Sequence, residues 1–384
     1  MKIALVSPYD WTVPGGVNSH CAHLRDHIRA KGHDVRVIAP ASRPVDDDGV
    51  ITIGKRPLSV PASGSLARIS LSLTLAPPVR RLLAEERFDV VHVHEPFMPM
   101  LPIHFLRYSE AVNVGTFHAS REKRQLLYMW GRRHLRRWFR RLDGKIAVST
   151  AASGFVEEYF PGYYNIIPNG VDVEHFSASV SPLPQFQDGK LNILFVGRPE
   201  KRKGLDILIR AYAKVKAQRP NTRLIVVGAG KFGRYERAVR SMRLSDVVFC
   251  GYVPLEELPR YHHSAHVFCA PATGFESQGI VLLEAMAAGL PLVASNIEGY
   301  AGVLTHGVEG LLALPGDDEG LAAALGELLD DPDRRRSMAE HGQRRAQEFS
   351  WPRVSQQVLS YYERLLHERG LTGLRPKQER VEVS

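Results

Sequence analysis

The sequence predicts an α/β protein of two Rossmann-like, doubly wound domains that face each other across a cleft. The chain has 384 residues, more than one hydrophobic core usually serves, so two domains are expected. Short apolar runs alternate with helical patterns, and the alternation stops near residue 177 and restarts at residue 191. Strands that are apolar throughout are typical of parallel sheets covered on both faces, so each half is expected to contain one such sheet.

The first half, residues 1–176, supplies five predicted strands and at least two helices. The strands are expected at residues 2–8, 34–39, 89–94, 112–117 and 144–149. One helix is expected from Asn18 to Lys31, because its apolar spacing is helical and Gly32 is a good residue to end it. A second helix is expected over 78–86. Strand–helix order of this kind predicts the first doubly wound domain.

The second half repeats this architecture without repeating the sequence. Residues 177–190 are rich in Ser, Pro, Gln, Asp and Gly without periodicity, which predicts a linker. Beyond it, strands are expected at residues 191–196, 223–227, 247–250, 267–269 and 291–294, and a helix at 205–218. We therefore expect a second domain over 191–351, a helix after Trp351-Pro352, and a flexible charged tail over 370–384.

Composition narrows the functional classes. Apolar residues make up 44% of the chain, and no apolar run approaches the roughly 20 residues of a membrane span. The start lacks the long apolar region of a signal peptide, and three cysteines suggest neither a disulfide framework nor a metal site. These features predict a protein of the reducing cytoplasm. The net charge of +9 favours an anionic partner such as nucleic acid, anionic lipid or a phosphorylated ligand.

Two adjacent glycines, Gly15 and Gly16, follow the first predicted strand and open a helix. Glycine lets the backbone approach a ligand closely, and the free N–H groups of a helix N-terminus attract anions. The pattern favours a diphosphate site, although an ordinary turn would use the same residues. Because it is neither a G-x-G-x-x-G string nor a P-loop, it disfavours NAD-dependent and ATP-hydrolysing functions.

A cationic loop follows the first strand of the second half. Within Gly197–Gly204 it carries Arg198, Lys201, Arg202 and Lys203. Ligands of doubly wound sheets bind beyond the carboxyl ends of the strands, which is where this loop lies. Fixed cations there would stabilise the charge that develops on a departing nucleoside diphosphate, although most charge runs are only solvated surface.

A string with two glutamates is the most informative motif. Glu276 precedes a predicted helix start at Gly279, and Glu284 follows within the helix. The free N–H groups of Gly279, Ile280 and Val281 suit a diphosphate. Glu276 would project toward a bound sugar, and Glu284 would accept hydrogen bonds from ribose hydroxyls. A single acid near a helix N-terminus would only complement the helix dipole, but the whole string predicts a nucleotide-sugar site.

These motifs resemble the retaining GT-B glycosyltransferases of family 4. The resemblance extends from Met1 to about Glu363 and includes the E-x7-E string, Gly-Arg-x-Glu-x-x-Lys-Gly, Pro-Asn-Gly-Val-Asp from Pro168, and Pro-Gly-Gly-Val from Pro14. Further strings are most similar to the phosphatidylinositol α-mannosyltransferases, namely Pro8-Tyr9, residues 92–96, residues 116–118 and residues 284–289.

The resemblance implies roles for individual residues. Gly16, Arg198, Lys203 and Glu284 would hold the nucleotide and diphosphate, and Glu276 would contact the donor sugar. His118 would lie near the anomeric carbon without acting as a general base, although a lone histidine at a strand end is more often structural. The helix over 352–369 would pack back on the first domain.

The acceptor side is implied by a smaller set. Tyr9, Asn18 and Lys123 fall where lipid-linked enzymes of the family hold the polar acceptor head. Asn18, Ala119 and Phe97 depart from the expected Gln, Thr and Asn, and these differences concern the acceptor more than the donor.

No metal or other cofactor is expected, because the resemblance implies metal-independent transfer. The string Asp46-Asp47-Asp48 has the composition of a solvated turn. We expect the cations of the Gly197–Gly204 loop to replace a divalent ion.

The stretch Arg121–Arg141 interleaves arginines and lysine with aromatic residues. This composition favours an interfacial helix on anionic lipid, and core packing, a nucleic-acid patch and a solvated face are the alternatives. No sequence-specific nucleic-acid module is evident, and no nucleic-acid partner is expected.

Together these features predict a retaining transferase that moves mannose from GDP-mannose to a lipid-linked or polyol acceptor at the inner face of the plasma membrane. One alternative is a transferase of the same fold that uses UDP-glucose with a diacylglycerol or soluble acceptor. A second is a non-enzymatic protein that binds nucleic acid through its basic stretch.

Overall fold

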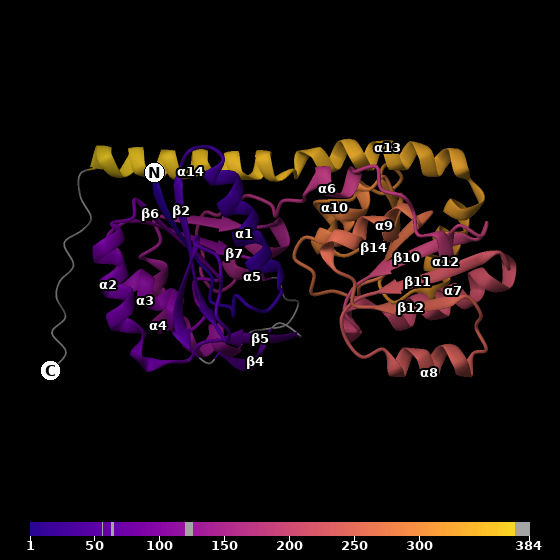
Figure 1. Cartoon of the computed structure of the whole chain (residues 1–384), viewed down its shortest axis with the longest axis horizontal. Coiled ribbons are helices and arrows are strands. Elements are labelled where there is room, and N and C mark those ends of the chain that lie inside the picture. The colour runs from indigo at the N-terminus through magenta and orange to yellow at the C-terminus, as the bar shows by residue number, and fades with distance from the viewer. Residues whose placement is uncertain (56, 63–64, 120–125, 373–384) are drawn as a thin grey trace.

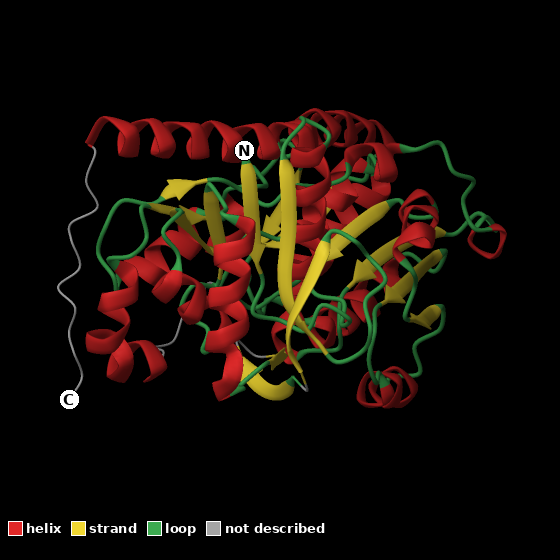
Figure 2. Ribbon diagram, turned by 60° about the vertical axis from the view of Figure 1, so that its left-hand side comes forward, coloured by secondary structure: helices red, strands yellow, loops and turns green. Residues whose placement is uncertain are grey.

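The computed structural model describes residues 1–55, 57–62, 65–119 and 126–372, and it contains two α/β domains that lie side by side. Figure 1 shows two helices in succession along one edge of both domains, and Figure 2 shows strands enclosed by helices on either side. The predicted fold class is confirmed.

The first domain is built on a parallel sheet. Within the described residues the sheet has seven strands in the order β3-β2-β1-β6-β7-β8-β9. The strands are β1 (Lys2–Val6), β2 (Asp34–Ala41), β3 (Val50–Lys55), β6 (Val90–His94), β7 (Val112–Phe117), β8 (Gly144–Ala147) and β9 (Asn165–Ile166). The helices are α1 (Gly16–Arg29), α2 (Ala76–Glu86), α3 (Leu101–Tyr108), α4 (Leu126–Phe139) and α5 (Thr150–Glu157), with a 3-10 turn η1 (Leu73–Leu75). A hairpin of β4 (Leu58–Ala62) and β5 (Ser65–Ile69), which the sequence did not predict, lies beside the sheet.

The second domain repeats the arrangement. Its described sheet has six parallel strands in the order β12-β11-β10-β13-β14-β15. The strands are β10 (Leu191–Val196), β11 (Thr222–Val227), β12 (Val247–Gly251), β13 (Val267–Ala270), β14 (Leu292–Ser295) and β15 (Gly310–Ala313). The helices are α7 (Leu205–Gln218), α8 (Gly233–Ser241), α9 (Leu258–His263), α10 (Ile280–Ala287), α11 (Glu298–Ala301), α12 (Asp318–Asp330) and α13 (Pro332–Glu348), with 3-10 turns η3 (Lys201–Lys203) and η4 (Leu255–Glu257).

The strands form because their apolar side chains are buried on both sheet faces. Ile3 and Leu5 of β1 pack under α1, whereas Ala4 and Val6 pack on the opposite face. All four are fully buried. Successive side chains of a strand point to opposite faces, so a continuous apolar run is explained by cover on both sides.

The chain crosses between the domains twice. The first crossing leads into α6 (Val173–Ser177) and the 3-10 turn η2 (Pro184–Phe186). The segment 177–190, predicted as a linker, buries Leu183 and Phe186 in the core of the second domain. Its polar composition gave no sign of these two anchors.

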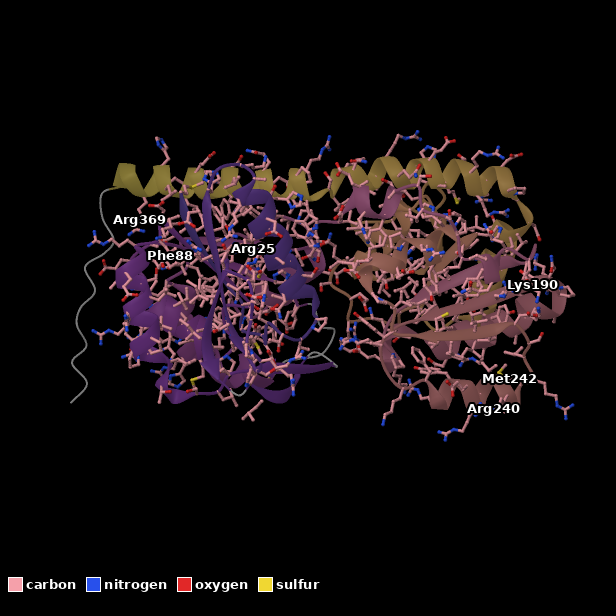
Figure 3. The ribbon with its side chains drawn as sticks, viewed as in Figure 1. Arg25, Phe88, Lys190, Arg240, Met242 and Arg369 are labelled. Atoms are coloured by element: carbon pink, nitrogen blue, oxygen red, sulfur yellow. The ribbon has the colours of Figure 1, made fainter. Side chains whose placement is uncertain are left out.

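The second crossing joins α13 to α14 (Trp351–Thr372). α14 packs against α1, and Figure 3 labels Arg369 near its end. Arg369 donates to the carbonyl of Glu110 in the first domain. The helix includes residues 370–372, which had been predicted as part of a flexible tail, whereas 373–384 lie outside the described residues. Among the described helices, none combines the length and apolar character that a membrane crossing requires.

The two crossings are bonded to each other. Val171 of the first pairs with Ser350 of the second. The N–H of Val171 donates to the carbonyl of Phe349 at 2.9 Å, and the N–H of Trp351 donates to the carbonyl of Val171 at 3.4 Å. The two segments that connect the domains therefore lie next to each other.

Gly204 allows the cationic loop to reach the neighbouring loop. Its φ is +70°, and a Cβ there would lie 1.9 Å from the carbonyl oxygen of Pro271. We expect Gly204→Ala to lower the free energy of unfolding by at least about 2 kcal/mol, because backbone must move and a left-handed residue is strained. Chemical denaturation measures the change. The control is Gly233→Ala in α8, where a Cβ would meet nothing within 4 Å. Equal unfolding midpoints for the two variants would contradict the requirement for glycine at position 204.

Candidate active site

The candidate site lies where strand order reverses in each sheet. β1 lies between β2 and β6, and β10 lies between β11 and β13. Such switch points open a crevice beyond the carboxyl ends of the strands. The predicted residues follow these strands or their neighbours: Tyr9, Gly15 and Gly16 after β1, His118 after β7, Arg198 and Lys203 after β10, and Glu276 and Gly279 after β13.

A cavity of about 320 Å³ joins elements of both domains. Gly16 and His20 line it from α1, Ile280 and Glu284 from α10, and Trp351 from the start of α14. The structure thus brings together three residues that the sequence assigned to the donor, Gly16, Ile280 and Glu284. A second hollow of about 210 Å³ is lined by Glu276 and by α5 of the first domain.

Both predicted helix N-termini form. α1 begins at Gly16 with Gly15 as its N-cap, and α10 begins at Ile280 with Gly279 as its N-cap. Both caps are glycines, so neither has a side chain that could bond to the first N–H groups of its helix, which include those of Ile280 and Val281. Gly279 has a φ of +75°, a conformation that glycine adopts without strain. Each N-terminus is suited to an anion.

Three cations of the Gly197–Gly204 loop form ion pairs with two glutamates. Lys203 Nζ lies 2.8 Å from Glu276 Oε1, and Arg202 also pairs with Glu276. Arg198 and Arg202 pair with Glu200 at 2.9 and 2.8 Å. Three cations against two carboxylates leave this cluster with a charge of +1, so it still favours an anion. Arg202 and Lys203 thus orient Glu276, which lines the hollow of about 210 Å³.

Glu284 lies one turn into α10, beside Lys203. Burial raises the pKa of its carboxyl to about 7, although the Lys203 charge opposes the shift. Near neutral pH this carboxyl exists in both protonation states, and in either state it can hydrogen-bond a hydroxyl. The position agrees with the ribose role that the family resemblance implies.

His118 is half-buried and contacts the buried imidazoles of His20 and His94. Its Nε2 lies 2.9 Å from His94 Nδ1, and its ring centre is 4.9 Å from that of His20. The N–H groups of His118 and Ala119 both donate to Glu95 Oε1, at 2.8 and 2.9 Å. Desolvation by burial holds the pKa of His118 well below its usual value, so the ring is neutral at pH 7. A neutral ring agrees with contact to the sugar rather than with a charge at the reaction centre.

The same imidazoles have the spacing of a metal site. Within the described chain, His20, His94 and His118 each offer a nitrogen within 4.8 Å of the others. The short His94–His118 contact already uses one nitrogen of each ring, and His20 Nδ1 is bonded to Asn169 Oδ1 at 3.0 Å. We therefore treat the group as a hydrogen-bonded network.

The predicted acceptor residues lie in different settings. Tyr9 forms an antiparallel bridge with Ile69 of the β4–β5 hairpin. Burial raises the pKa of its hydroxyl far above the usual value. Asn18 is buried, and its amide accepts from Ser7 Oγ at 2.7 Å and donates to the carbonyl of Asp10 at 2.9 Å. The Asn18 amide therefore holds the loop after β1 in place. Lys123 lies outside the described residues.

Phe97 is part of the first-domain core. Its ring contacts Phe117 and Phe160, with centroids 5.5 and 4.6 Å apart, and it is 2% exposed. The Asn expected at this position would be a polar group in an apolar cluster. The departure at Phe97 is thus explained by packing.

The described part of the basic stretch is an amphipathic helix. Tyr128 and Leu135 of α4 pack into the core, while Arg133, Arg136 and Arg137 are exposed. Arg141 had been predicted as part of the cationic surface, but its guanidinium donates to the carbonyls of Leu106 and Ser109 at 2.9 and 2.7 Å. Arg141 therefore anchors the end of α3. Residues 121–125 lie outside the described part.

Sequence reasoning assigned no role to three residues of this site. They are His20, Asn169 and Gln278, each less than 8% exposed. Asn169 lies in the Pro-Asn-Gly-Val-Asp string and Gln278 in the E-x7-E string, and these motifs were the signal that could have pointed to them. Their pairing across 109 positions of sequence was not visible in it.

Comparison with known proteins covers both domains. A model described as Glycosyltransferase Family 4 matches residues 14–175, and one described as Glycosyl transferases group 1 matches residues 177–345. Phosphatidyl-myo-inositol mannosyltransferases of Mycobacterium leprae and Mycolicibacterium smegmatis are 37% and 36% identical, over 94% of this chain and 96% and 94% of theirs. A glycogen synthase of Mycobacterium tuberculosis is 30% identical over 100% of this chain and 99% of its own.

Solved structures share the fold. Sucrose-phosphate synthase from Thermosynechococcus elongatus has a TM-score of 0.78 at 22% identity, covering 96% of this chain and 99% of its own. Anabaena HepE in complex with UDP-glucose has a TM-score of 0.71 at 20% identity, covering 95% and 100%. The resemblance inferred from the motifs is confirmed.

The buried imidazoles make stability depend on pH. Burial lowers the pKa of His20 to about 4 and of His92 to about 3, and those of His94 and His118 well below their usual value. The unfolded chain binds protons on these groups below about pH 6.5 while the folded chain does not. Stability is therefore lost as the pH falls from 6.5 toward 4. Glu284 acts in the opposite direction from about pH 7 to 4.5, but it is one group against four.

We expect His92→Asn to flatten this dependence, by about 1.4 kcal/mol per pH unit below pH 6, because one buried ring no longer contributes. Denaturant titrations at pH 7.5, 6.5 and 5.5 measure the slope. The control is His367→Asn, which changes an exposed ring near the end of α14. An unchanged slope in His92→Asn would contradict the assignment.

Proposed function

Because this chain belongs to glycosyltransferase family 4, we propose that it transfers mannose from GDP-mannose to phosphatidylinositol with retention of anomeric configuration. The chain is a glycosyltransferase, and its relatives support mannose and phosphatidylinositol. The observation that carries the finer proposal is similarity over 94% of the chain to phosphatidyl-myo-inositol mannosyltransferases.

The donor is proposed to bind mainly to the second domain. Its diphosphate lies between the N-terminus of α10, the N-terminus of α1 and the cations Arg198 and Lys203. Glu284 accepts from the ribose. Glu276 binds the sugar hydroxyls, and the diphosphate takes over part of its pairing with Lys203. Because Lys203 and Arg198 are already in place, the charge on the departing diphosphate is stabilised with little reorganisation.

The reaction is proposed to occur on one face of the sugar. The departing phosphate accepts the proton of the attacking hydroxyl, and His118 contacts the sugar near the anomeric carbon. A retaining hydrolase would need two carboxylates about 5 Å apart across the bond, and we assign no such pair. No metal ion is proposed, since the cations of the Gly197–Gly204 loop supply positive charge.

The acceptor is proposed to reach the cleft from an anionic membrane surface. The exposed Arg133 lies one turn before the exposed Arg136 and Arg137, on a helix whose other side packs in the core. An apolar inner side and a cationic outer side suit a helix that lies on anionic lipid. We accordingly propose peripheral association with the cytoplasmic face of the plasma membrane.

An alternative donor has its own support. HepE in complex with UDP-glucose shares the fold, and the glycogen synthase relative is similar over the whole chain. A UDP-glucose transferase with a diacylglycerol or soluble acceptor is therefore the second candidate. A nucleic-acid-binding protein is the weakest candidate, because it would leave the donor-site residues without a role.

The donor nucleotide can be tested by thermal shift. We expect GDP to raise the melting temperature by several degrees at 100 times its dissociation constant, since a ligand that binds only the folded chain adds about 2.7 kcal/mol there. UDP at the same concentration is the comparison. A larger shift with UDP would favour the second candidate.

Lys203 can be tested against a neighbouring lysine. We expect Lys203→Ala to lower kcat by about 100-fold or more, because it removes a fixed charge from the departing diphosphate. Mannose transfer to phosphatidylinositol vesicles is measured by mass spectrometry. The control is Lys201→Ala in the same 3-10 turn, where the side chain is exposed. Near-normal turnover in both Lys203→Ala and Glu276→Ala would refute the assignment of this site.

A further inference from the structure

We infer that Gln278 is a positioning residue that acts through Asn169 to fix the hydrogen-bonding state of His20, the ring that packs against His118. The donor-binding loop of the second domain would thus control the histidines of the first. This inference rests on the proposed function for its catalytic consequence, although the hydrogen bonds do not depend on it.

Three buried polar side chains form the connection. Gln278 lies between Glu276 and the start of α10, Asn169 lies on the first crossing, and His20 lies on α1. Their exposures are 4%, 6% and 5%. Because unmade hydrogen bonds are costly at such burial, each polar atom of the connection is constrained by its partner.

The backbone of Asn169 fixes the orientation of the Gln278 amide. A backbone N–H only donates, so the atom 2.6 Å from Asn169 N must be the oxygen Oε1 of Gln278. A carbonyl only accepts, so the atom 3.1 Å from Asn169 O must be the nitrogen Nε2. Two independent backbone groups therefore give the same orientation.

The oriented Gln278 amide then fixes Asn169 and His20. Gln278 Oε1 also accepts from Asn169 Nδ2 at 2.8 Å, which turns the oxygen Oδ1 of Asn169 toward His20. That oxygen lies 3.0 Å from His20 Nδ1. An amide oxygen cannot donate, so His20 Nδ1 carries the proton. Because burial lowers the pKa of His20 to about 4, the ring is neutral and its Nε2 is left with a lone pair.

The ring of His20 packs against the candidate catalytic histidine. His20 meets His118 and His94 edge to face, with ring centres 4.9 and 5.2 Å apart. Without Gln278 the Asn169 amide could turn over, and His20 would then adopt either tautomer.

The connection joins this histidine group to the loop that is proposed to bind the donor. Gln278 is two residues from Glu276 and adjacent to Gly279, so a donor that orders this loop also orders Gln278. The link would assemble the sugar-facing histidine only when the donor loop is in place. Coupling of this kind adjusts turnover more than donor affinity.

The test compares Gln278→Leu with Gln278→Glu. Leucine removes both hydrogen-bonding atoms at similar size, whereas a glutamate oxygen still accepts from Asn169 N and Nδ2. Ring 15N chemical shifts in histidine-labelled full-length protein report which nitrogen carries the proton, with His20→Gln used to assign the signals. We expect Nδ1–H on His20 in the wild type and in Gln278→Glu, and a mixture of tautomers in Gln278→Leu.

Turnover is expected to follow the ring state. In Gln278→Leu kcat should fall on the order of 10- to 100-fold while the donor KM changes far less, because the reacting groups are misplaced. Gln278→Glu should recover most of the loss. A single Nδ1–H tautomer in Gln278→Leu, or equal losses of kcat in both variants, would overturn the inference.

Two further outcomes are separable. If Gln278→Leu does not fold, Asn169→Asp serves instead: a carboxylate facing Nδ1 should let His20 titrate at a higher pH than in the wild type, and an unchanged titration would overturn the inference. If the wild type transfers no mannose, the proposed function fails, and the ring shifts still decide whether the connection exists.

Discussion

Parallel strands send their carboxyl ends to one edge of a sheet, and the whole candidate site depends on that constraint. In each domain the first strand has neighbours on both sides, so the loops that follow it are left free to meet a ligand. The glycines at the start of α1 follow such a strand, and so does the cationic loop with Arg198 and Lys203. The E-x7-E string follows the neighbouring strand β13. Fold and site are therefore parts of one arrangement.

The two domains differ in the charges that they bring to the cleft. The second domain contributes a cluster in which Glu276 lies between Arg202 and Lys203. The first contributes imidazoles that burial keeps neutral. A charged diphosphate is therefore attracted mainly to the second domain, while the imidazoles of the first domain offer neutral hydrogen-bonding groups. This division suits a reaction in which negative charge develops on the departing diphosphate.

The sequence predicted those features that depend on local chemistry. Apolar runs predicted most strands of both sheets, and glycines predicted the starts of α1 and α10, because backbone conformation and burial leave a direct pattern. β3 and the β4–β5 hairpin were missed, since their residues mix apolar, polar, Gly and Pro types. The short strands β9 and β15 were missed as well. The burial of Leu183 and Phe186 was missed because it depends on a distant core.

Side-chain partners were the harder part. Arg141 looked like one more surface cation until the carbonyls at the end of α3 accepted its hydrogen bonds. Asn18 looked available to an acceptor, yet Ser7 and Asp10 occupy its amide. The connection from Gln278 to His20 joins three segments that are distant in sequence. One-dimensional patterns do not contain such pairings.

The bond between the two crossings has a mechanical consequence. Since Val171 and Ser350 are paired, both connections share one pivot, about which the two domains would rotate. Displacement in a rotating body grows with distance from its axis. His20 and Trp351, close to this pivot, would hardly shift during such a rotation, whereas α8 and the β4–β5 hairpin, on the opposite margin in Figure 1, would move more. The two domains can thus separate at that margin while the residues around His20 keep their geometry.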